Sequence, residues 1–467
     1  EAQKYNSTLT NWDSYWAGSD VNFLLKSRFC VPSDWAGPIA LHLPLGVSGD
    51  IFTHPEALVH IDNEPVASAD RYHHTIPLDP ALADNRSHLL ALHGWTGLSG
   101  WPPDPDSKAR LFMRQCAVVE IDEALQAFIA LADTALGAAR HMAEDRPERH
   151  TILNVLDAAF AALDTRDPLA THLHESVARA HDMLEEGLAR AGGPMPVDLH
   201  AIGHAHMDIA YLWPVSQIRR KNARTTSNVL RMMERHPQFV FSHSQPQLYQ
   251  YTERDYPDLF DRIAERVAEG RWEPIGGMWV EPDLSMPGAE ALVRQMLLGR
   301  RYFRDKFGDA ETPVLWLPDT FGFPASLPQL MKKAGLRWFV SNKMSWNQYN
   351  RLPFSSGWWQ GIDGTRVLAQ FLTTPRPVAH LPFPTNYKSD LTPKEVFGTW
   401  ENSASKERVA TLPICYGYGD GGGGPTDDLI RTLGAWGKVP GAPRVRPSTV
   451  RGFFEDLERT ADHLPTW

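Results

Sequence analysis

Three short segments of the sequence each place a histidine or a carboxylate directly after an apolar run. The first holds His206 and Asp208 after residues 197–202, the second holds Asp319, and the third holds Asp420 before four glycines. In an extended chain, residues i and i+2 project to the same side. His206 and Asp208 can therefore converge on one cation, and zinc accepts nitrogen and oxygen ligands of this kind. Together the three segments predict one active site.

Each segment alone also has a purely structural interpretation. His206 fits a strand end, and Asp208 and Asp319 fit the caps of following helices. His204 alternates in phase with His206 and is a further candidate ligand. The glycines at 421–424 resemble a phosphate cradle, but the lysine that follows such a loop in P-loop proteins is missing. The site is therefore favoured by the three segments together.

Two further carboxylates and several aromatic residues accompany these segments. Glu281 and Asp283 follow a strand-like run, where the simpler interpretation is a solvated loop. Aromatic side chains beside loop carboxylates are typical of sugar pockets, because a pyranose ring has apolar faces and hydroxylated edges. Most aromatic side chains belong to the core, so the aromatic residues near these segments are only candidates to bind such a substrate: Tyr211, Trp213, Trp279, Phe321, Phe323, Trp346, Tyr416 and Tyr418.

Three regions of different texture must position these residues, and they predict an α/β fold. Residues 1–120 carry short alternating segments between Pro, Gly and Asp, which predicts an N-terminal β-sandwich. Residues 121–193 have helical spacing and predict a helical linker region of two helices separated at Pro147. Residues 194–445 predict a (β/α) barrel-like catalytic domain with a mainly parallel sheet. Residues 446–467 are expected to begin a following helical region that is truncated.

The third region alternates apolar runs with amphipathic segments. Strands are predicted at 197–202, 239–241, 314–316, 338–341, 367–371 and 412–416. Helices are predicted at 252–269, 288–306, 327–334 and 427–435. Ligands in such folds bind outside the carboxyl ends of the strands, which is where the three segments lie.

Composition excludes several classes of function. The net charge of -10 argues against nucleic acid and an acidic membrane as partners. No apolar run reaches the ~18 residues that a membrane span needs, and the first residues are not a signal peptide. Cys30, Cys116 and Cys415 are far apart and form no C-x-x-C pair, so they favour a reducing, cytoplasmic setting over a disulfide framework.

The motifs resemble a known family. Residues 203–214, GHAHMDIAYLWP, resemble the zinc motif of the α-mannosidases of glycoside hydrolase family 38, in particular their cytosolic or vacuolar branch. Further segments match the same branch in the same order: 276–283, 316–322, 341–347 and 417–426. The specific resemblance covers residues 195–467.

This resemblance implies a retaining, zinc-dependent α-mannosidase that hydrolyses terminal α-mannosyl residues of oligosaccharides. It implies zinc ligands at His206, Asp208 and Asp319, with Asp319 also acting as the nucleophile. It implies that Asp420 is the general acid/base. Because a general acid starts protonated, we expect the pKa of Asp420 to be raised, and the two catalytic carboxyls to lie about 5 Å apart.

The resemblance further implies that Tyr211 and Phe321 line the sugar site and that Glu281 and Asp283 lie close to it. Tyr211 stands where the family usually has Trp, so a smaller aromatic platform is expected.

The family's fourth zinc ligand is a histidine in a segment that begins just after a Trp like Trp467. We therefore expect a fragment that lacks the C-terminal domains and holds one Zn²⁺, or another divalent cation, weakly. The expected partners are a mannose-containing oligosaccharide and either a second copy of the chain or the C-terminal portion.

Three alternatives remain open from the residues. A zinc-dependent carbohydrate deacetylase needs a His-x-x-x-His pair, and His200 and His204 have this spacing but precede the site. An amidohydrolase would pair His204 with His206 and then need later strand-end histidines, for which His243 and His380 are poor candidates. The third alternative is an inactive glycan-binding fragment. Zinc content and glycoside turnover together separate these alternatives.

Overall fold

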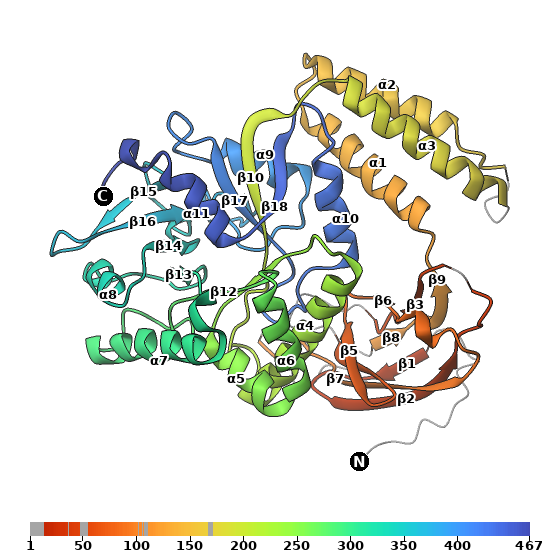
Figure 1. Cartoon of the computed structure of the whole chain (residues 1–467), viewed down its shortest axis with the longest axis horizontal. Coiled ribbons are helices and arrows are strands. Elements are labelled where there is room, and N and C mark those ends of the chain that lie inside the picture. Colours follow the sequence, from red (N-terminus) through yellow and green to blue (C-terminus); the bar gives the residue numbers. More distant parts are fainter. Residues whose placement is uncertain are drawn as a thin grey trace.

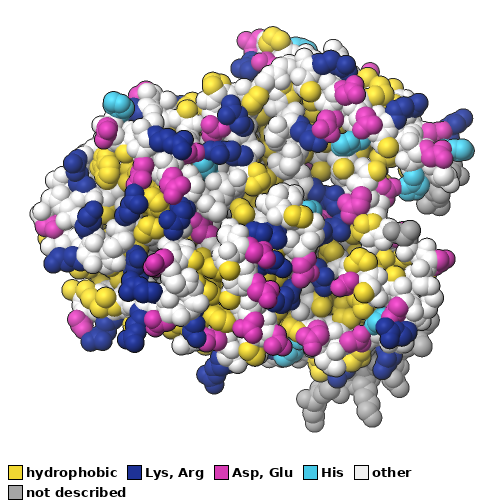
Figure 2. Space-filling model, viewed as in Figure 1, with side chains coloured by type: hydrophobic (Ala, Val, Ile, Leu, Met, Phe, Trp, Pro, Cys, Tyr) yellow, Lys and Arg dark blue, Asp and Glu magenta, His cyan; other side chains and the backbone are white. Residues whose placement is uncertain are grey.

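The N-terminal part of the chain forms antiparallel sheets, three helices follow, and the larger C-terminal part is α/β (Figure 1). This computed structural model describes residues 14–35, 37–46, 55–100, 102–104, 106, 111–166 and 171–467. None of the helices in these ranges combines the length and apolar character required to cross a membrane. Basic and acidic side chains are interspersed over the face drawn in Figure 2.

The N-terminal strands form two antiparallel sheets and one short ribbon. The four-stranded sheet has the order β2 (Asn22–Cys30), β7 (Ser87–Trp95), β4 (Glu56–Ile61) and β5 (Glu64–Ala69). The three-stranded sheet has the order β6 (Thr75–Pro77), β3 (Ile39–His42) and β9 (Ala117–Glu120), and β1 (Ser14–Ala17) pairs with β8 (Leu111–Met113). Both larger sheets contribute to one apolar cluster that includes Leu41 and Val59. Antiparallel sheets in this region are therefore confirmed.

The helical region contains three helices where the sequence predicted two. These are α1 (Glu123–His141), α2 (Pro147–Ala161) and α3 (Thr171–Arg190). Asp122 caps α1 by accepting a hydrogen bond from Leu125 N at 2.9 Å. Pro147 begins α2, a position where its missing N–H costs nothing. The small side chains on the buried face of α1 let it pack against α10 (Asp427–Trp436) of the C-terminal part.

The C-terminal part contains three short sheets of mainly parallel strands. In the first, β10 (Met195–Gly203) lies between β17 (Thr411–Tyr416) and β18 (Pro443–Ser448), and in the second β11 (Phe241–His243) pairs with β12 (Trp272–Pro274). The third has the order β13 (Val314–Leu317), β14 (Trp338–Ser341), β16 (Arg366–Phe371) and the antiparallel β15 (Ser356–Gln360).

The expected barrel is not closed by any strand pairing in the described part of the chain. Single parallel bridges, His204 with Ser242 and Gly276 with Leu315, join the three sheets in series. β11 and β12 are only three residues long, and the antiparallel β15 ends the series. The mixed α/β class is confirmed, whereas the barrel is corrected to a series of short sheets.

Most predicted helices of this part are present, but one is divided. α7 (Ala289–Phe307), α8 (Leu327–Lys333) and α10 match their predictions to within a residue or two. The single helix expected at 252–269 is replaced by α5 (Pro246–Asp255) and α6 (Pro257–Ala268). Tyr256, which precedes Pro257, has φ -145° and ψ 66°, because a residue before proline is pushed out of the helical region.

Two further helices were not predicted, α4 (Val215–Arg235) and α9 (Pro393–Glu401), whereas α11 (Val450–Glu458) lies where a following helical region was expected to begin. α4 lies between the N-terminal four-stranded sheet and the parallel strands, and most of its polar residues are buried. α11 buries Phe453 and Phe454 in the same cluster as Ile202 of β10. Residues 446–467 therefore pack into the same core as the strands before them.

The cysteines sit in different environments. Cys30 on β2 is exposed, whereas Cys415 on β17 is buried, and all three are free thiols. Burial raises the pKa of the Cys415 thiol and brings that of Cys116 to about 11.

Candidate active site

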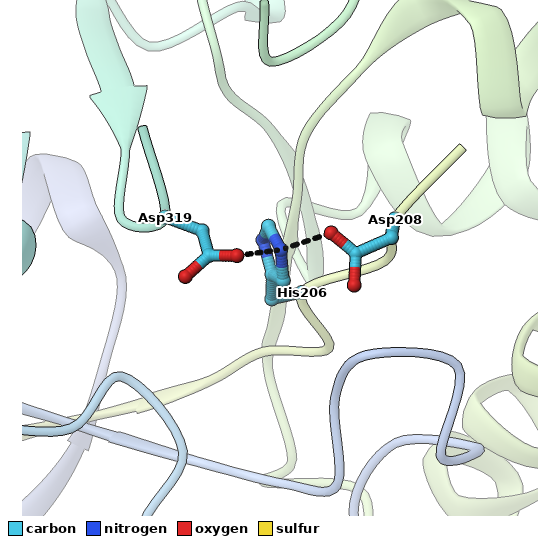
Figure 3. Close-up of side chains that lie close together, drawn as sticks. All are labelled: His206, Asp208 and Asp319. Carbon is cyan, nitrogen blue, oxygen red and sulfur yellow. Dashed lines mark hydrogen bonds and ion pairs between the residues drawn. The ribbon is translucent and has the colours of Figure 1, made fainter. Parts of the chain in front are cut away.

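His206 and Asp208 lie in the segment that leaves the carboxyl end of β10, and Asp319 lies just after β13. In Figure 3 the imidazole of His206 stands between the two carboxylates. His206 Nε2 is 3.2 Å from Asp208 Oδ1 and 3.7 Å from Asp319 Oδ2. One candidate ligand atom from each residue lies within 4.8 Å of the others. Two strand ends that are far apart in the sequence are thus brought together. The extended segment approaches β11 closely, since a Cβ at Gly203 would lie 2.6 Å from Val240 O.

Glu281 contacts both His206 and Asp319. Its Oε2 lies 3.2 Å from His206 Nδ1. Its Oε1 accepts hydrogen bonds from the backbone N–H of Asp319 at 2.6 Å and from that of the next residue at 2.8 Å. Gln245 links this layer to the β10 segment, because its side chain accepts from Glu281 N and donates to Met207 O. Carboxylates that orient a ligating imidazole in this way raise metal affinity.

The donors of this cluster fit a zinc ion. His206 Nδ1, Glu281 Oε2 and Asp319 Oδ1 are buried without a hydrogen bond in the described part of the chain, and Asp319 Oδ1 forms an ion pair with Lys343. His206 Nδ1 and Glu281 are near enough for an ion pair but are not aligned for a hydrogen bond. Burial lowers the pKa of His206, but the charges of Glu281 and Asp208 outweigh burial and raise it well above its usual value. One imidazole and two carboxylates make a set that zinc binds.

Lys343 is a functional candidate that the sequence did not single out. It follows β14, and its Nζ lies 2.5 Å from Asp319 Oδ1. The ammonium group also stands 3.8 Å from the ring centroid of Trp346 and 4.8 Å from that of Phe321. Its position directly after a strand was the available signal.

Asp420 follows β17 and shares the site through two residues that the sequence analysis also missed. Tyr387 donates a hydrogen bond to Asp420 Oδ1 at 2.9 Å, and Lys388 Nζ pairs with Oδ2. The Tyr387 ring lies 4.9 Å from the His206 ring. Burial and then the charges of Asp420, Asp319 and Asp208 raise the pKa of Tyr387. The carboxylates of Asp208, Asp319 and Asp420 therefore all lie near the buried Tyr387.

The expected raised pKa of Asp420 is wrong for this structure. Burial raises the pKa, but the charges of Lys388 and His206 and the hydrogen bonds to Lys388 and Tyr387 outweigh burial and lower it to about 2. The substrate-free protein therefore carries Asp420 as a carboxylate. Its backbone has φ 57°, a left-handed conformation that favours glycine.

The predicted sugar-binding residues divide into two groups. Tyr211 and Phe321 are 63% and 58% exposed, and the Phe321 ring packs edge-on against Trp346 at 6.3 Å. Trp279 instead donates to Gln247 Oε1 and packs its ring against Tyr302 of α7.

Asp283 is exposed and accepts from the backbone N–H groups of Ser285 and Met286 at 2.7 Å, as a turn residue does. Among the described residues, Phe321 and Glu281 lie at the cluster, whereas Trp279 bonds to Gln247 and Asp283 bonds to its own turn, away from the cluster.

His204 is not available as a ligand, which removes the basis of the amidohydrolase alternative. Its Nδ1 donates to Ser242 O at 2.7 Å, and its Nε2 accepts from Trp316 Nε1 at 3.2 Å. Burial lowers its pKa to about 3, so the imidazole is neutral with both nitrogens engaged. His200 is likewise bonded to Ser448 Oγ and Arg446.

The comparison with known proteins agrees with this geometry. The family described as "Glycosyl hydrolases family 38 N-terminal domain" matches residues 196–467. The chain belongs to glycosyl hydrolase family 38. All of the metal-ligand and carboxylate candidates of this family 38 chain lie inside the matched residues, whereas the N-terminal sheets lie outside them.

Several relatives are named α-mannosidases. Human alpha-mannosidase 2C1 is 32% identical over 454 residues, covering 95% of this chain and 41% of the relative. The Saccharomyces cerevisiae alpha-mannosidase is 28% identical, covering 98% and 42%, and Dictyostelium discoideum alpha-mannosidase G is 39% identical, covering 57% and 24%. A solved α-mannosidase from Enterococcus faecalis V583 has a TM-score of 0.47 at 18% identity, covering 58% of this chain and 30% of that chain. The family 38 chain thus spans about two fifths of the length of the human and yeast relatives.

Proposed function

We propose that this chain carries the active site of a retaining, zinc-dependent α-mannosidase that hydrolyses terminal α-mannosyl residues of oligosaccharides. The observation that carries the proposal is the convergence of His206, Asp208 and Asp319 in a chain of family 38. These three residues would hold one Zn²⁺, a role that the ligand set also allows for other divalent cations. The α-mannosidase names of its relatives support the substrate class.

Asp319 is the proposed nucleophile. Its carboxylate attacks the anomeric carbon and forms a covalent glycosyl ester, as in other retaining glycosidases. Lys343 holds Oδ1, and two backbone N–H groups bound to Glu281 fix the peptide on which Asp319 sits. The zinc ion, when bound, supplies positive charge that orients the sugar and stabilises charge at the reacting centre. Tyr211 and Phe321 supply apolar faces for the ring.

Asp420 is the proposed acid and base. In the first step it gives a proton to the leaving oxygen, and in the second it takes a proton from the attacking water. The second step needs the carboxylate form, which the Lys388 pair maintains in the substrate-free protein. For the first step a proton must reside on Asp420, and the Lys388 ammonium group opposes this protonation by stabilising the carboxylate.

Asp319→Ala tests the proposal, because one carboxylate serves as both ligand and nucleophile. We expect the variant to lose hydrolysis of an aryl α-mannoside by more than about a hundredfold and to retain less zinc. Zinc content by atomic absorption and turnover are measured on the natural polypeptide that contains this sequence. Asp283→Ala is the control, since Asp283 is exposed in a turn and should leave zinc content unchanged. Normal zinc content and normal turnover in Asp319→Ala would contradict the proposal.

A matched assay separates the remaining alternatives. Release of acetate from an acetylated sugar without glycoside cleavage would point to a deacetylase. Glycan binding without turnover of any α-mannoside by the zinc-loaded protein would point to a binding fragment. Retention is checked by proton NMR of the first sugar released, which should keep the α configuration.

A further inference from the structure

The loop that carries Asp420 is held from behind by a buried arginine of α4. Arg224 is 1% exposed, and its Nη2 donates to the backbone carbonyl of Gly421, the residue directly after Asp420. The same guanidinium group donates to Glu56 Oε2 at 3.0 Å and to Asp70 Oδ2. Arg224 therefore joins the loop to two carboxylates of the N-terminal four-stranded sheet and its end. A planar guanidinium group fixes several acceptors at once in a way that a lysine cannot.

Asp70 is itself rigidly held. It is 1% exposed and accepts from the backbone N–H groups of Tyr72 and His73 at 2.8 and 3.0 Å. His73 Nδ1 lies 2.9 Å from the same carboxylate, and Ser68 Oγ donates to it at 2.8 Å. A carboxylate with this many partners gives Arg224 a fixed anchor.

The N-terminal region contacts the loop at two more points. A Cβ at Gly423, which has φ 88°, would lie 2.9 Å from Asp70 Oδ2 and 2.8 Å from His73. Tyr72 stacks on Tyr418 with ring centroids 3.6 Å apart and an interplanar angle of 6°. The loop therefore rests on the N-terminal region both before and after Asp420.

Asp420 needs such support, because its left-handed backbone conformation is strained in a residue that has a Cβ. Surroundings must over-determine a conformation of this kind for it to persist. The Gly421 carbonyl belongs to the Gly421–Gly422 peptide, one residue beyond Asp420, so the bond from Arg224 restricts the loop backbone next to Asp420. The two carboxylates that bind Arg224 belong to Asp70 and Glu56, which lie outside the family-matched residues 196–467.

We propose that Arg224 and Asp70 are positioning residues for Asp420, so that the N-terminal region takes part in proton transfer to the leaving group. The inference rests on the proposed glycosidase function. The chain of contacts runs from the Asp70 carboxylate through the Arg224 guanidinium group to the Gly421 carbonyl and hence to the Asp420 side chain. A network that only stabilised the fold would affect all substrates equally.

The test compares two substrates in the natural, zinc-loaded polypeptide. A dinitrophenyl α-mannoside has a good leaving group and hardly needs an acid, whereas an α-linked mannobiose needs one. Asp420→Ala defines the pattern of a lost acid. We expect Arg224→Lys and Asp70→Asn to lose kcat/KM on mannobiose by about tenfold or more while losing less than about threefold on the dinitrophenyl substrate. Their zinc content should equal that of the wild type.

Arg219→Lys is the matched control. Arg219 is also on α4 and holds Asp255 with two N–H groups, but it does not contact the loop. We expect this variant to lose equally on both substrates or not at all. Thermal midpoints of all variants are measured so that the kinetics are compared below the lowest of them.

Equal losses on the two substrates in Arg224→Lys and Asp70→Asn would overturn the inference, and so would an unchanged mannobiose rate. If those two variants do not fold, Asn228→Ser replaces them. Asn228 donates to Gly423 O and Pro425 O from the same helix, and the same substrate dependence is required of it. Failure of the proposed function is distinguishable, because the wild type would then cleave neither mannoside.

Discussion

At the residue scale, the protonation of Asp420 depends on Lys388, which lies in another segment of the chain. Lys388 pairs with its carboxylate, and the pKa of Asp420 is about 2. As the proposed acid, Asp420 must be protonated, so we expect activity on substrates with poor leaving groups to fall as pH rises above the pKa of this group. We therefore expect the Lys388 pair to lower the pH at which the alkaline limb of the profile falls.

We expect Lys388→Met to raise the pKa of Asp420, because burial then acts on the carboxylate without the opposing ammonium charge. A raised pKa keeps Asp420 protonated to higher pH, so the alkaline limb of kcat/KM on mannobiose should move upward by about one pH unit or more. The measurement is the pH profile of kcat/KM for the wild type and the variant. An alkaline limb that stays in place or moves downward would show that Lys388 does not control this proton.

Tyr211→Ala tests whether the Tyr211 ring binds the sugar. Tyr211 is 63% exposed and follows the β10 segment in the sequence. Loss of this ring face should lower kcat/KM by about fivefold, corresponding to ~1 kcal/mol, with zinc content unchanged. Phe160→Ala serves as control, since Phe160 is a half-exposed aromatic on α2 with no contact to the site. Equal kcat/KM in Tyr211→Ala and the wild type would remove Tyr211 from the sugar site.

The residues that could be predicted from the sequence share one property: each follows an apolar run and belongs to a short local pattern. The sequence places His206 and Asp208 on one side of an extended segment, and Asp319 just after a strand. Tyr387 and Lys388 lie in an irregular segment with no period, so nothing local indicated that they face Asp420. Such contacts depend on how distant segments meet, which a single sequence does not encode in any local pattern.

At the scale of elements, α4 shows why a long helix escaped prediction. A helix is usually recognised by an apolar stripe with polar residues on the opposite face. α4 buries polar side chains instead, among them Lys221, Arg224 and Asn228. Each has partners supplied by other elements, such as Glu56, which lies 2.7 Å from Lys221 Nζ. Buried charges are tolerated when paired, and the pairing residues lie more than a hundred positions away in the sequence.

Two glycines on helices give a matched pair of stability predictions. A Cβ at Gly299 of α7 would lie 2.6 Å from the backbone carbon of Met278 and 2.8 Å from Trp279 N. Gly299→Ala should therefore push α7 away from the loop before Glu281 and destabilise the protein by about 1–3 kcal/mol. Gly434 of α10 is exposed with nothing within 4 Å, so Gly434→Ala should stabilise by about 0.5–1 kcal/mol.

Denaturant unfolding of both glycine variants provides the measurement. Because Gly299 supports the segment that leads to Glu281, Gly299→Ala should also retain less zinc, whereas Gly434→Ala should not. A Gly299→Ala variant as stable as the wild type would show that α7 can shift freely against that loop.

At the scale of the whole molecule, the sequence predicted the fold class and the order of the regions correctly, but it did not predict how the parallel strands join into sheets. Alternating strands and helices indicated a mainly parallel α/β part, which the structure contains. The strands of the described residues do not close into a barrel, and the sheet of β11 and β12 is joined to the other two sheets by single bridges only. The N-terminal sheets were predicted, but their ionic contact with α4 was not, since buried ion pairs have no sequence signature.

The contrast between Cys30 and Cys415 allows the opening of this protein to be timed. An exposed thiol on the edge of the N-terminal sheet should react with a thiol reagent in a single fast phase. The buried Cys415, whose raised pKa leaves little thiolate, reacts only when β17 parts from β10, so its rate measures the population of opened molecules. If the N-terminal region and the parallel sheets separate together, Asp70→Asn should accelerate labelling of Cys415 even though Asp70 lies 345 positions earlier in the chain. Mass spectrometry of quenched samples then measures two labelling rates, that of Cys30 at the surface and that of Cys415 in the interior.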